Sequence, residues 1–294
     1  MNQNEVIKKL SKEYRRGLPS LQEFASILNE IKNCHEHRFV IDLTDYRFIH
    51  PCFAVLLAAM PYVNIKTAIR YKTNDKKCVD FLKKSGIYDH FTSKRAVQEI
   101  VHKTSLNTFK TISTSDECLE VAQDTVSAFP IYFNDRLKSE LVSLLYEVIS
   151  NSFFHSNQKQ VYCCGFFDSQ GAFNFSIYDF GVGIPYNVKT YLNKNLSDEK
   201  AIEWAWKRGH STLNGTVDYP RGAGFHSLEA FVKANHGDIL VGSRNGYGRV
   251  ALNNKKFGLM NATLPGTFFS MRIKKDFQHK YIENENNDII KKDI

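Results

Sequence analysis

The sequence has no C-x-x-C pair and no long apolar run, and both absences exclude classes of protein. Its 6 cysteines are scattered over 294 residues, which argues against a zinc ribbon or a thioredoxin-like redox site. The longest apolar run, PCFAVLLAAMPYV, is shorter than the roughly 20 residues that cross a bilayer. No apolar leader follows Met1. We therefore expect a cytoplasmic protein with reduced thiols and no membrane association.

Positive charge is in excess over one part of the chain. The net charge is +8, and most of this excess lies in residues 1–105. A basic segment can face nucleic acid or an acidic partner, but no aromatic–basic repeat or nucleic-acid motif accompanies it. A solvated basic surface is the simpler interpretation. Nucleic-acid binding stays an alternative without support of its own.

The first third of the chain alternates helical and β-rich patterns. Apolar spacing predicts helices over 21–34, 50–60 and 75–91, and β-rich runs predict strands over 38–44 and 65–71. Strands that alternate with helices are typical of an α/β fold with a parallel or mixed sheet.

Part of this region resembles a known family. FVIDLTDYRFIHPCFAVLLAAM, followed by FLKKSGIYDHF, is similar to the STAS domain of bacterial anti-sigma-factor antagonists over residues 36–95. The resemblance implies a STAS-like α/β domain, here residues 1–105, that docks a protein partner. In that family a Ser or Thr in the turn after the strand is phosphorylated. The corresponding turn, Ile49 to Phe53, has no hydroxyl, so we expect no phosphorylation there. Cys52 in this turn is expected to be a buried helix-start residue, with a redox switch as the alternative.

A polar row follows one predicted helix in the second half of the chain. RLKSELVSLLYEVISNSFFHS at 136–156 has helical spacing, and Glu147, Asn151 and His155 are four residues apart. They therefore share one face of the helix. A solvated face, which is the alternative, more often carries Lys and Glu than a central Asn. We interpret the row as a candidate site.

Three glycine-containing segments come later. YDFGVGIP places Asp179 at the end of an apolar run, before Gly181 and Gly183; taken alone, this pattern is more typical of a capped turn than of a binding site. RGAGFHSL at 221–228 opens a predicted helix whose free N–H groups suit phosphate. LPGTFF at 264–269 places a Gly-Thr pair at the head of another strand.

Together with EVISNSFFH, these segments resemble the four motifs of the GHKL superfamily over residues 115–274. This superfamily includes DNA gyrase, the ninety-kilodalton heat-shock chaperones, histidine kinases, MutL and the anti-sigma-factor kinases. The resemblance implies a Bergerat α/β sandwich over residues 106–275 that binds ATP and Mg²⁺. It implies that Asn151 coordinates magnesium, that Asp179 accepts a hydrogen bond from the adenine amino group and that Thr267 holds the adenine. The other nucleotide-binding positions that it implies are His155, Gly181, Gly183, Ile184, Arg221, Gly222, Gly224 and Phe225.

Glu147 is the candidate catalytic residue. It lies one helical turn before Asn151, where a carboxylate can orient or deprotonate a nucleophile. Residues 186–221 are expected to be a mobile lid over ATP, because long irregular segments often cover sites. A short helix with Trp204 and Trp206 is expected within this segment. Lys207, Arg208 and Arg221 are its candidates for reaching the γ-phosphate.

The size of the chain and the STAS-like region favour the anti-sigma-factor kinases as the nearest branch. We expect an ATP-binding regulatory protein with ATPase or serine/threonine kinase activity, whose STAS-like domain docks a partner. A nucleotide-gated interaction module without turnover and a nucleic-acid-associated ATPase are the alternatives, and a homodimer stays open. Residues 276–294 are polar and are expected to form a flexible tail.

Overall fold

The computed structural model describes residues 5–11, 13–45, 48–73, 76, 109–155, 161–207, 209–210, 224–284 and 289–294. The first part of the chain forms β1 (Glu5–Lys9), β2 (Glu13–Tyr14), α1 (Leu18–Lys32), β3 (Arg38–Asp42), β4 (Phe48–Ile49), the 3₁₀ helix η1 (Pro51–Phe53), α2 (Ala54–Val63) and β5 (Ala68–Lys72). The helix expected over 75–91, with the last part of the STAS resemblance, lies outside the described residues.

The second part begins with β6 (Phe109–Ile112), α5 (Ser115–Ser127), β7 (Ile131–Phe133), α6 (Asp135–His155), β8 (Val161–Phe167) and β9 (Phe173–Asp179). It continues with α7 (Ile184–Leu192), α8 (Asp198–Ala205), α9 (Gly224–Ala234), β10 (Asp238–Ala251), β11 (Asn254–Ile273), β12 (Asp276–Glu283) and β13 (Ile289–Asp293). None of the described helices is both long and apolar enough to cross a bilayer.

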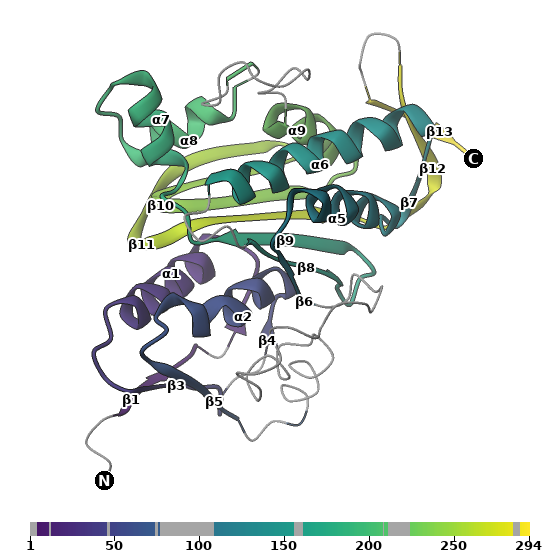
Figure 1. Ribbon diagram of the computed structural model, residues 1–294. Helices are drawn as coiled ribbons and strands as arrows, with labels where there is room; N and C mark the ends of the chain where they lie inside the picture. The colour runs from purple at the N-terminus through teal and green to yellow at the C-terminus, as the bar shows by residue number, and fades with distance from the viewer. Residues whose placement is uncertain are drawn as a thin grey trace.

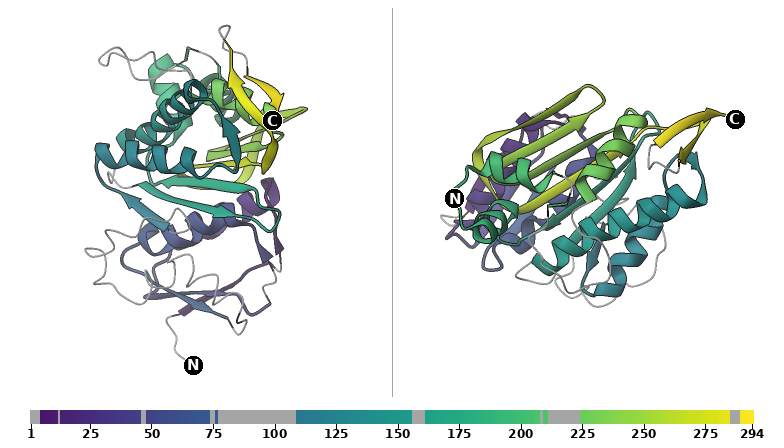
Figure 2. Two further views of the ribbon diagram at one scale, coloured as in Figure 1. Left: turned by 90° about the vertical axis from the view of Figure 1, so that its right-hand side faces the viewer. Right: turned by 90° about the horizontal axis from the view of Figure 1, so that it is seen from above.

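These elements stack in alternating layers of strands and helices (Figure 1). A parallel sheet of order β1-β3-β5 lies at the bottom of the view, and α1 and α2 cover it. Above them lies an antiparallel sheet of order β10-β11-β9-β8-β6. Helices α5, α6 and α9 cover its upper face, as the view from above also shows (Figure 2). The α/β class expected from the sequence is confirmed.

The large sheet is covered on both faces, and β9 shows this directly. All of its residues are buried. Phe175 and Ile177 belong to the apolar core under α5, α6 and α9, whereas Tyr178 belongs to the core shared with α1 and α2. A strand that is buried on both faces needs a layer on each side. The elements β1 to β5, with α1 and α2, are here called the N-terminal layers, and they supply the second cover.

Aromatic stacking joins the N-terminal layers to the large sheet. The ring of Phe53 lies 5.0 Å from that of Phe24 and 5.8 Å from that of Phe268 on β11. All three side chains are fully buried. Aromatic pairs at such distances add to the stability that area burial provides. The faces of α1 and α2 that point at the sheet are thus occupied within the chain.

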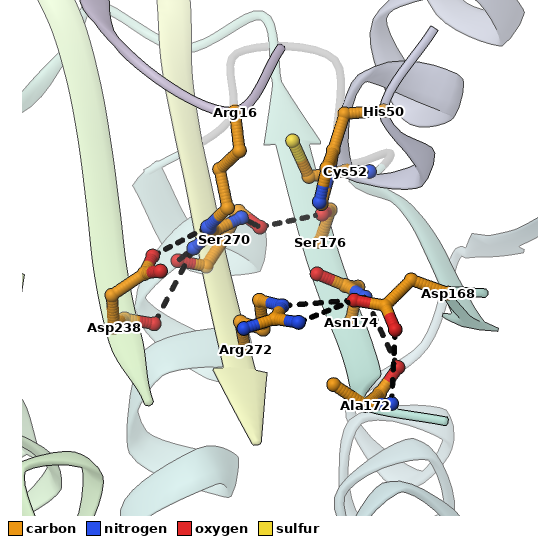
Figure 3. A network of polar contacts seen from close by, with 10 residues as sticks. All are labelled: Arg16, His50, Cys52, Asp168, Ala172, Asn174, Ser176, Asp238, Ser270 and Arg272. Atoms are coloured by element: carbon orange, nitrogen blue, oxygen red, sulfur yellow. Dashed lines mark hydrogen bonds and ion pairs between the residues drawn. The ribbon is translucent and has the colours of Figure 1, made fainter. Parts of the chain in front are cut away.

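A buried ion pair crosses the same boundary (Figure 3). The Arg16 side chain, only 5% exposed, forms an ion pair with Asp238 on β10. It also donates hydrogen bonds to the hydroxyl of Ser270 at 2.6 Å and to its carbonyl oxygen at 2.9 Å. The Ser270 hydroxyl bonds in turn to Ser176 on β9 at 2.9 Å. A charge this deep is tolerated because both its charge and its N–H groups are satisfied.

Cys52 lies beside this ion pair and is buried, as expected for a helix-start residue. The residue is 1% exposed, and burial raises the pKa of its thiol to about 12. The thiolate is the reactive form of cysteine. A thiol held protonated in the core does not suit a redox switch.

The expectation of a flexible tail over 276–294 is wrong for its described residues, 276–284 and 289–294. β12 runs parallel to β7 and pairs with β13. Tyr281 is fully buried, and its hydroxyl donates to Asp276 at 2.7 Å. The segment is polar apart from a few residues such as the buried Tyr281, so its composition did not indicate a strand. The strand is stabilised by β7, which lies far away in the sequence.

The first testable prediction concerns Arg16. Replacing Arg16 by Ala leaves Asp238 buried without its counter-charge, so the free energy of unfolding should fall by about 3–5 kcal/mol. Urea denaturation measures this change. The matched control is Arg15→Ala, because Arg15 is 82% exposed and pairs with Glu13 at the surface. Such a pair contributes at most about 1 kcal/mol. Equal losses in the two variants would contradict a structural role for the buried pair.

Candidate functional site

A pocket opens beside the last turns of α6, where most of the predicted site residues meet. Its cavity volume is about 110 Å³. The predicted residues that line it are Glu147, Asn151, His155, Asp179, Gly183, Ile184, Phe225 and Thr267. Gly181 lies next to the pocket and Gly224 is the first residue of α9. Arg221, Gly222 and Arg208 lie outside the described residues, so their assignments stay predictions.

Helix α6 supplies one wall of the pocket. Its apolar stripe, including Leu141, Leu145 and Ile149, is buried in the core. Four-residue spacing places Glu147, Asn151 and His155 together along another face, and all three line the pocket. The polar row is therefore part of a concave site, and the alternative of a plain solvated face is wrong.

Asp179 ends β9 at the base of the pocket and is only 3% exposed. Burial raises the pKa of Asp179 to about 7, although hydrogen bonds from the Gly181 N–H, the Ser152 side chain and the Thr267 N–H oppose the shift. Folding thus raises the pKa of this carboxyl above its unfolded value, so the group lowers the stability of the fold as pH rises from about 4 to about 7. A costly buried carboxyl in a pocket is typical of a functional group.

The glycines after Asp179 are required by close approaches of the backbone. The Gly181 N–H donates to the Asp179 carboxylate at 2.8 Å, and a Cβ at Gly181 would overlap the carbonyl oxygen of His155. Gly183 has φ +89°, in the region that favours glycine. The loop therefore packs tightly against the end of α6 and begins α7. The segment is a turn capped by Asp179, and it also forms part of the pocket wall through Gly183 and Ile184.

Gly266 lets β11 reach Asp179. It has φ +96°, and a Cβ there would overlap the carbonyl oxygen of Asp179. The next residue, Thr267, pairs directly with Asp179 in the antiparallel register. The Gly-Thr pair recognised in the sequence thus places a threonine beside the buried carboxyl.

Ser243 on β10 is a site residue that the sequence analysis missed. Its hydroxyl accepts a hydrogen bond from the Ile184 N–H at 3.0 Å and donates to the Gly266 carbonyl at 3.0 Å. It also lies 3.0 Å from the Thr267 hydroxyl. One fully buried side chain therefore ties the glycine loop to the Gly-Thr pair. A lone serine in a β-rich run gives no local signal of this role.

The described part of the segment expected to be a mobile lid, residues 186–207 and 209–210, is largely helical. α7 and α8 occupy much of it, and the Lys189 ammonium lies 2.6 Å from Asp198. The other carboxylate oxygen of Asp198 accepts the Asn245 N–H at 3.0 Å. The long hairpin of β10 and β11 therefore anchors these helices. The short helix expected around Trp204 and Trp206 is present as α8, with Trp206 as its C-cap, whereas helix α7 was not expected from the sequence.

Comparisons with known proteins add little to this geometry. No family model matches the chain, and no curated protein matches it. Among the solved structures that match is the mycobacterial sensor histidine kinase MprB, with 15% sequence identity over 54% of this chain and 92% of that one, and a TM-score of 0.29. At this TM-score the likeness carries no argument about the fold or the activity of the chain.

The second prediction tests the close approach at Gly266. Gly266→Ala adds an overlap with the Asp179 carbonyl to the strain of a positive φ, so we expect a loss of about 3 kcal/mol or more in unfolding free energy. Gly209 is the matched control, because it has φ +77° and a Cβ added there would meet nothing within 4 Å. Gly209→Ala should cost only the backbone strain, about 1–2 kcal/mol. Comparable losses in urea denaturation would show that Gly266 is not needed for close approach.

Proposed function

We propose that the pocket binds Mg-ATP and that the chain is a GHKL-type ATPase or serine/threonine protein kinase. The observation that carries this proposal is the placing of Asp179, Thr267, Asn151 and Glu147 in one pocket. These residues come from three separate segments of the chain. Each has the chemistry that one part of a magnesium–nucleotide complex requires.

Asp179 would bind the adenine. Its ionised carboxylate accepts a hydrogen bond from the exocyclic amino group of adenine, whereas guanine has a carbonyl oxygen at that position. A buried group that must pair with a donor discriminates strongly against a ligand that lacks the donor. Thr267, held beside Asp179 by the pairing of β11 with β9, supplies a second polar contact on the same edge of the pocket.

Asn151 and the start of α9 would hold the phosphate side. An amide oxygen is a hard ligand of the kind that Mg²⁺ prefers, and it leaves the charge of the metal available to the phosphates. α9 begins at Gly224, and the N–H groups of its first turn suit an anion. Bound Mg²⁺ would neutralise charge that develops on the phosphates.

Glu147 would act on the nucleophile. It lies one helical turn before Asn151 on the wall of the same pocket, so a carboxylate is available near the proposed metal position. In an ATPase it would orient and deprotonate water, and in a kinase it would take the proton of a partner's hydroxyl. The two activities differ only in which hydroxyl enters the pocket.

The N-terminal layers support a second candidate, in which ATP gates partner binding without useful turnover. Leu21 of α1 packs over Gly242 so closely that a Cβ added to this glycine would lie 2.8 Å from the leucine Cδ2. Gly242 precedes Ser243, which bonds to the glycine loop and to Thr267. A displacement of the glycine loop or of Thr267 would therefore reach α1 through Ser243, Gly242 and Leu21. A partner would dock on surfaces of residues 1–105 other than the faces buried against the sheet.

The third prediction separates the metal ligand from the base. Asn151→Ala should abolish measurable Mg-ATP binding. Glu147→Ala should leave the Kd for Mg-ATP nearly unchanged and slow phosphate release or phosphotransfer by about 10²–10⁴-fold, the usual effect of losing a general base. Calorimetry measures binding, and a phosphate-release assay with and without candidate partner proteins measures turnover.

The control for these variants is Glu120→Ala, which removes an exposed carboxylate from α5 and should change neither quantity. Weakened binding in both pocket variants with unchanged turnover would make Glu147 structural. A wild type that binds ATP but shows no turnover with any partner would favour the gated interaction module.

A further inference from the structure

His210 lines the same pocket as the polar row of α6, and no role follows for it from the motifs. It comes after the end of α8 and is half-buried. Its ring packs on Trp204 with centroids 4.4 Å apart and planes inclined by 33°. Its Nδ1 lies 2.9 Å from the Trp204 carbonyl oxygen. Two contacts therefore fix the orientation of the imidazole.

The carbonyl contact decides which nitrogen carries the proton. A carbonyl oxygen only accepts, so Nδ1 must donate to it. In the neutral ring Nε2 then has the lone pair, and in the protonated ring Nε2 is a second donor. Within the part of the chain that the structure describes, no hydrogen-bond partner is found for Nε2.

Contacts at the end of α8 place His210 near the start of α9. The ring of Trp206, four residues before His210, stacks on Phe225 with centroids 4.9 Å apart. The Trp206 Nε1–H donates to Glu229 on α9 at 2.7 Å. The backbone N–H of His210 donates to the Lys207 carbonyl oxygen at 3.2 Å, which holds His210 close to the end of α8. His210 thus belongs to the end of the pocket where α9 begins.

The charge of the pocket makes a donor at this place significant. Among its described lining residues, Glu147 and Asp179 are carboxylates, and none is Lys or Arg. A polyphosphate in such a pocket needs donors and positive charge. The imidazolium form of His210 provides both, because each of its ring nitrogens is then a donor.

We propose that His210 binds the phosphate chain of the nucleotide, with Nε2 donating to a phosphate oxygen while Nδ1 stays on the Trp204 carbonyl. This inference rests on the proposed function and names the phosphate contact that α8 contributes to the site. The residue that follows α8 would then contribute a charged contact to the phosphate chain. The ligand class is a nucleotide with an extended phosphate chain, ADP or ATP, as opposed to a nucleoside.

The experiment compares Mg-ATP with adenosine by calorimetry on the full chain. His210→Asn keeps an amide donor near the Trp204 carbonyl and removes the nitrogen that faces the pocket. Affinity for Mg-ATP should fall about 10- to 100-fold, as for a lost charged hydrogen bond, with adenosine affinity unchanged. His210→Gln extends an uncharged donor toward the position of Nε2, so its loss for Mg-ATP should be smaller than that of His210→Asn.

The outcomes separate this inference from the proposed function. Unchanged Mg-ATP affinity in His210→Asn and His210→Gln, with normal wild-type binding, overturns the His210 assignment alone. Equal losses for Mg-ATP and adenosine also overturn it, because they would mean that His210 only packs the wall. A wild type that binds neither ligand overturns the proposed function and the assignment together.

Discussion

The approach of Gly266 to the backbone of Asp179 is the constraint on which the pocket depends. Because no side chain separates them, β11 can pair with the last residue of β9 and set Thr267 beside the buried carboxyl. Ser243 then bonds to both sides of this junction. The position of the glycine loop, and with it the start of α7, follows from these contacts. The large sheet thus fixes the polar groups of the pocket in place before any ligand enters.

The same sheet carries the N-terminal layers on its other face, so the two parts of the chain share a core. Phe53 of η1 stacks on Phe268 of β11, and Arg16, which precedes α1, pairs with Asp238 of β10. Phe268 follows Thr267 in β11, so one side chain points to each side of the sheet. Neighbouring residues of β11 therefore contact the pocket on one side and the N-terminal layers on the other.

Local patterns predicted the parts of the site that depend on one segment. Helical spacing alone places Glu147, Asn151 and His155 on one face. The pattern Asp-x-Gly-x-Gly, which begins at Asp179, indicates the loop after β9. The sequence could not reveal that Ser243 bonds to the walls of the pocket or that His210 lines it, because these placements depend on strand register and on packing between α8 and α9. The ordered tail was missed for the same reason, since β12 is stabilised by β7, which lies far away in the sequence.

The most direct test of the account compares Mg-ATP with Mg-GTP by calorimetry at pH 8, where a carboxyl with a pKa of about 7 is largely ionised. Mg-ATP should bind the wild type at least about tenfold more tightly than Mg-GTP. At pH 6 most of the Asp179 carboxyl is protonated, so the Mg-ATP affinity of the wild type should be about tenfold lower at pH 6 than at pH 8. Asp179→Asn lacks this titration, so its own affinity should not show this fall. Equal affinity for Mg-ATP and Mg-GTP at pH 8 would contradict the central claim that Asp179 recognises adenine.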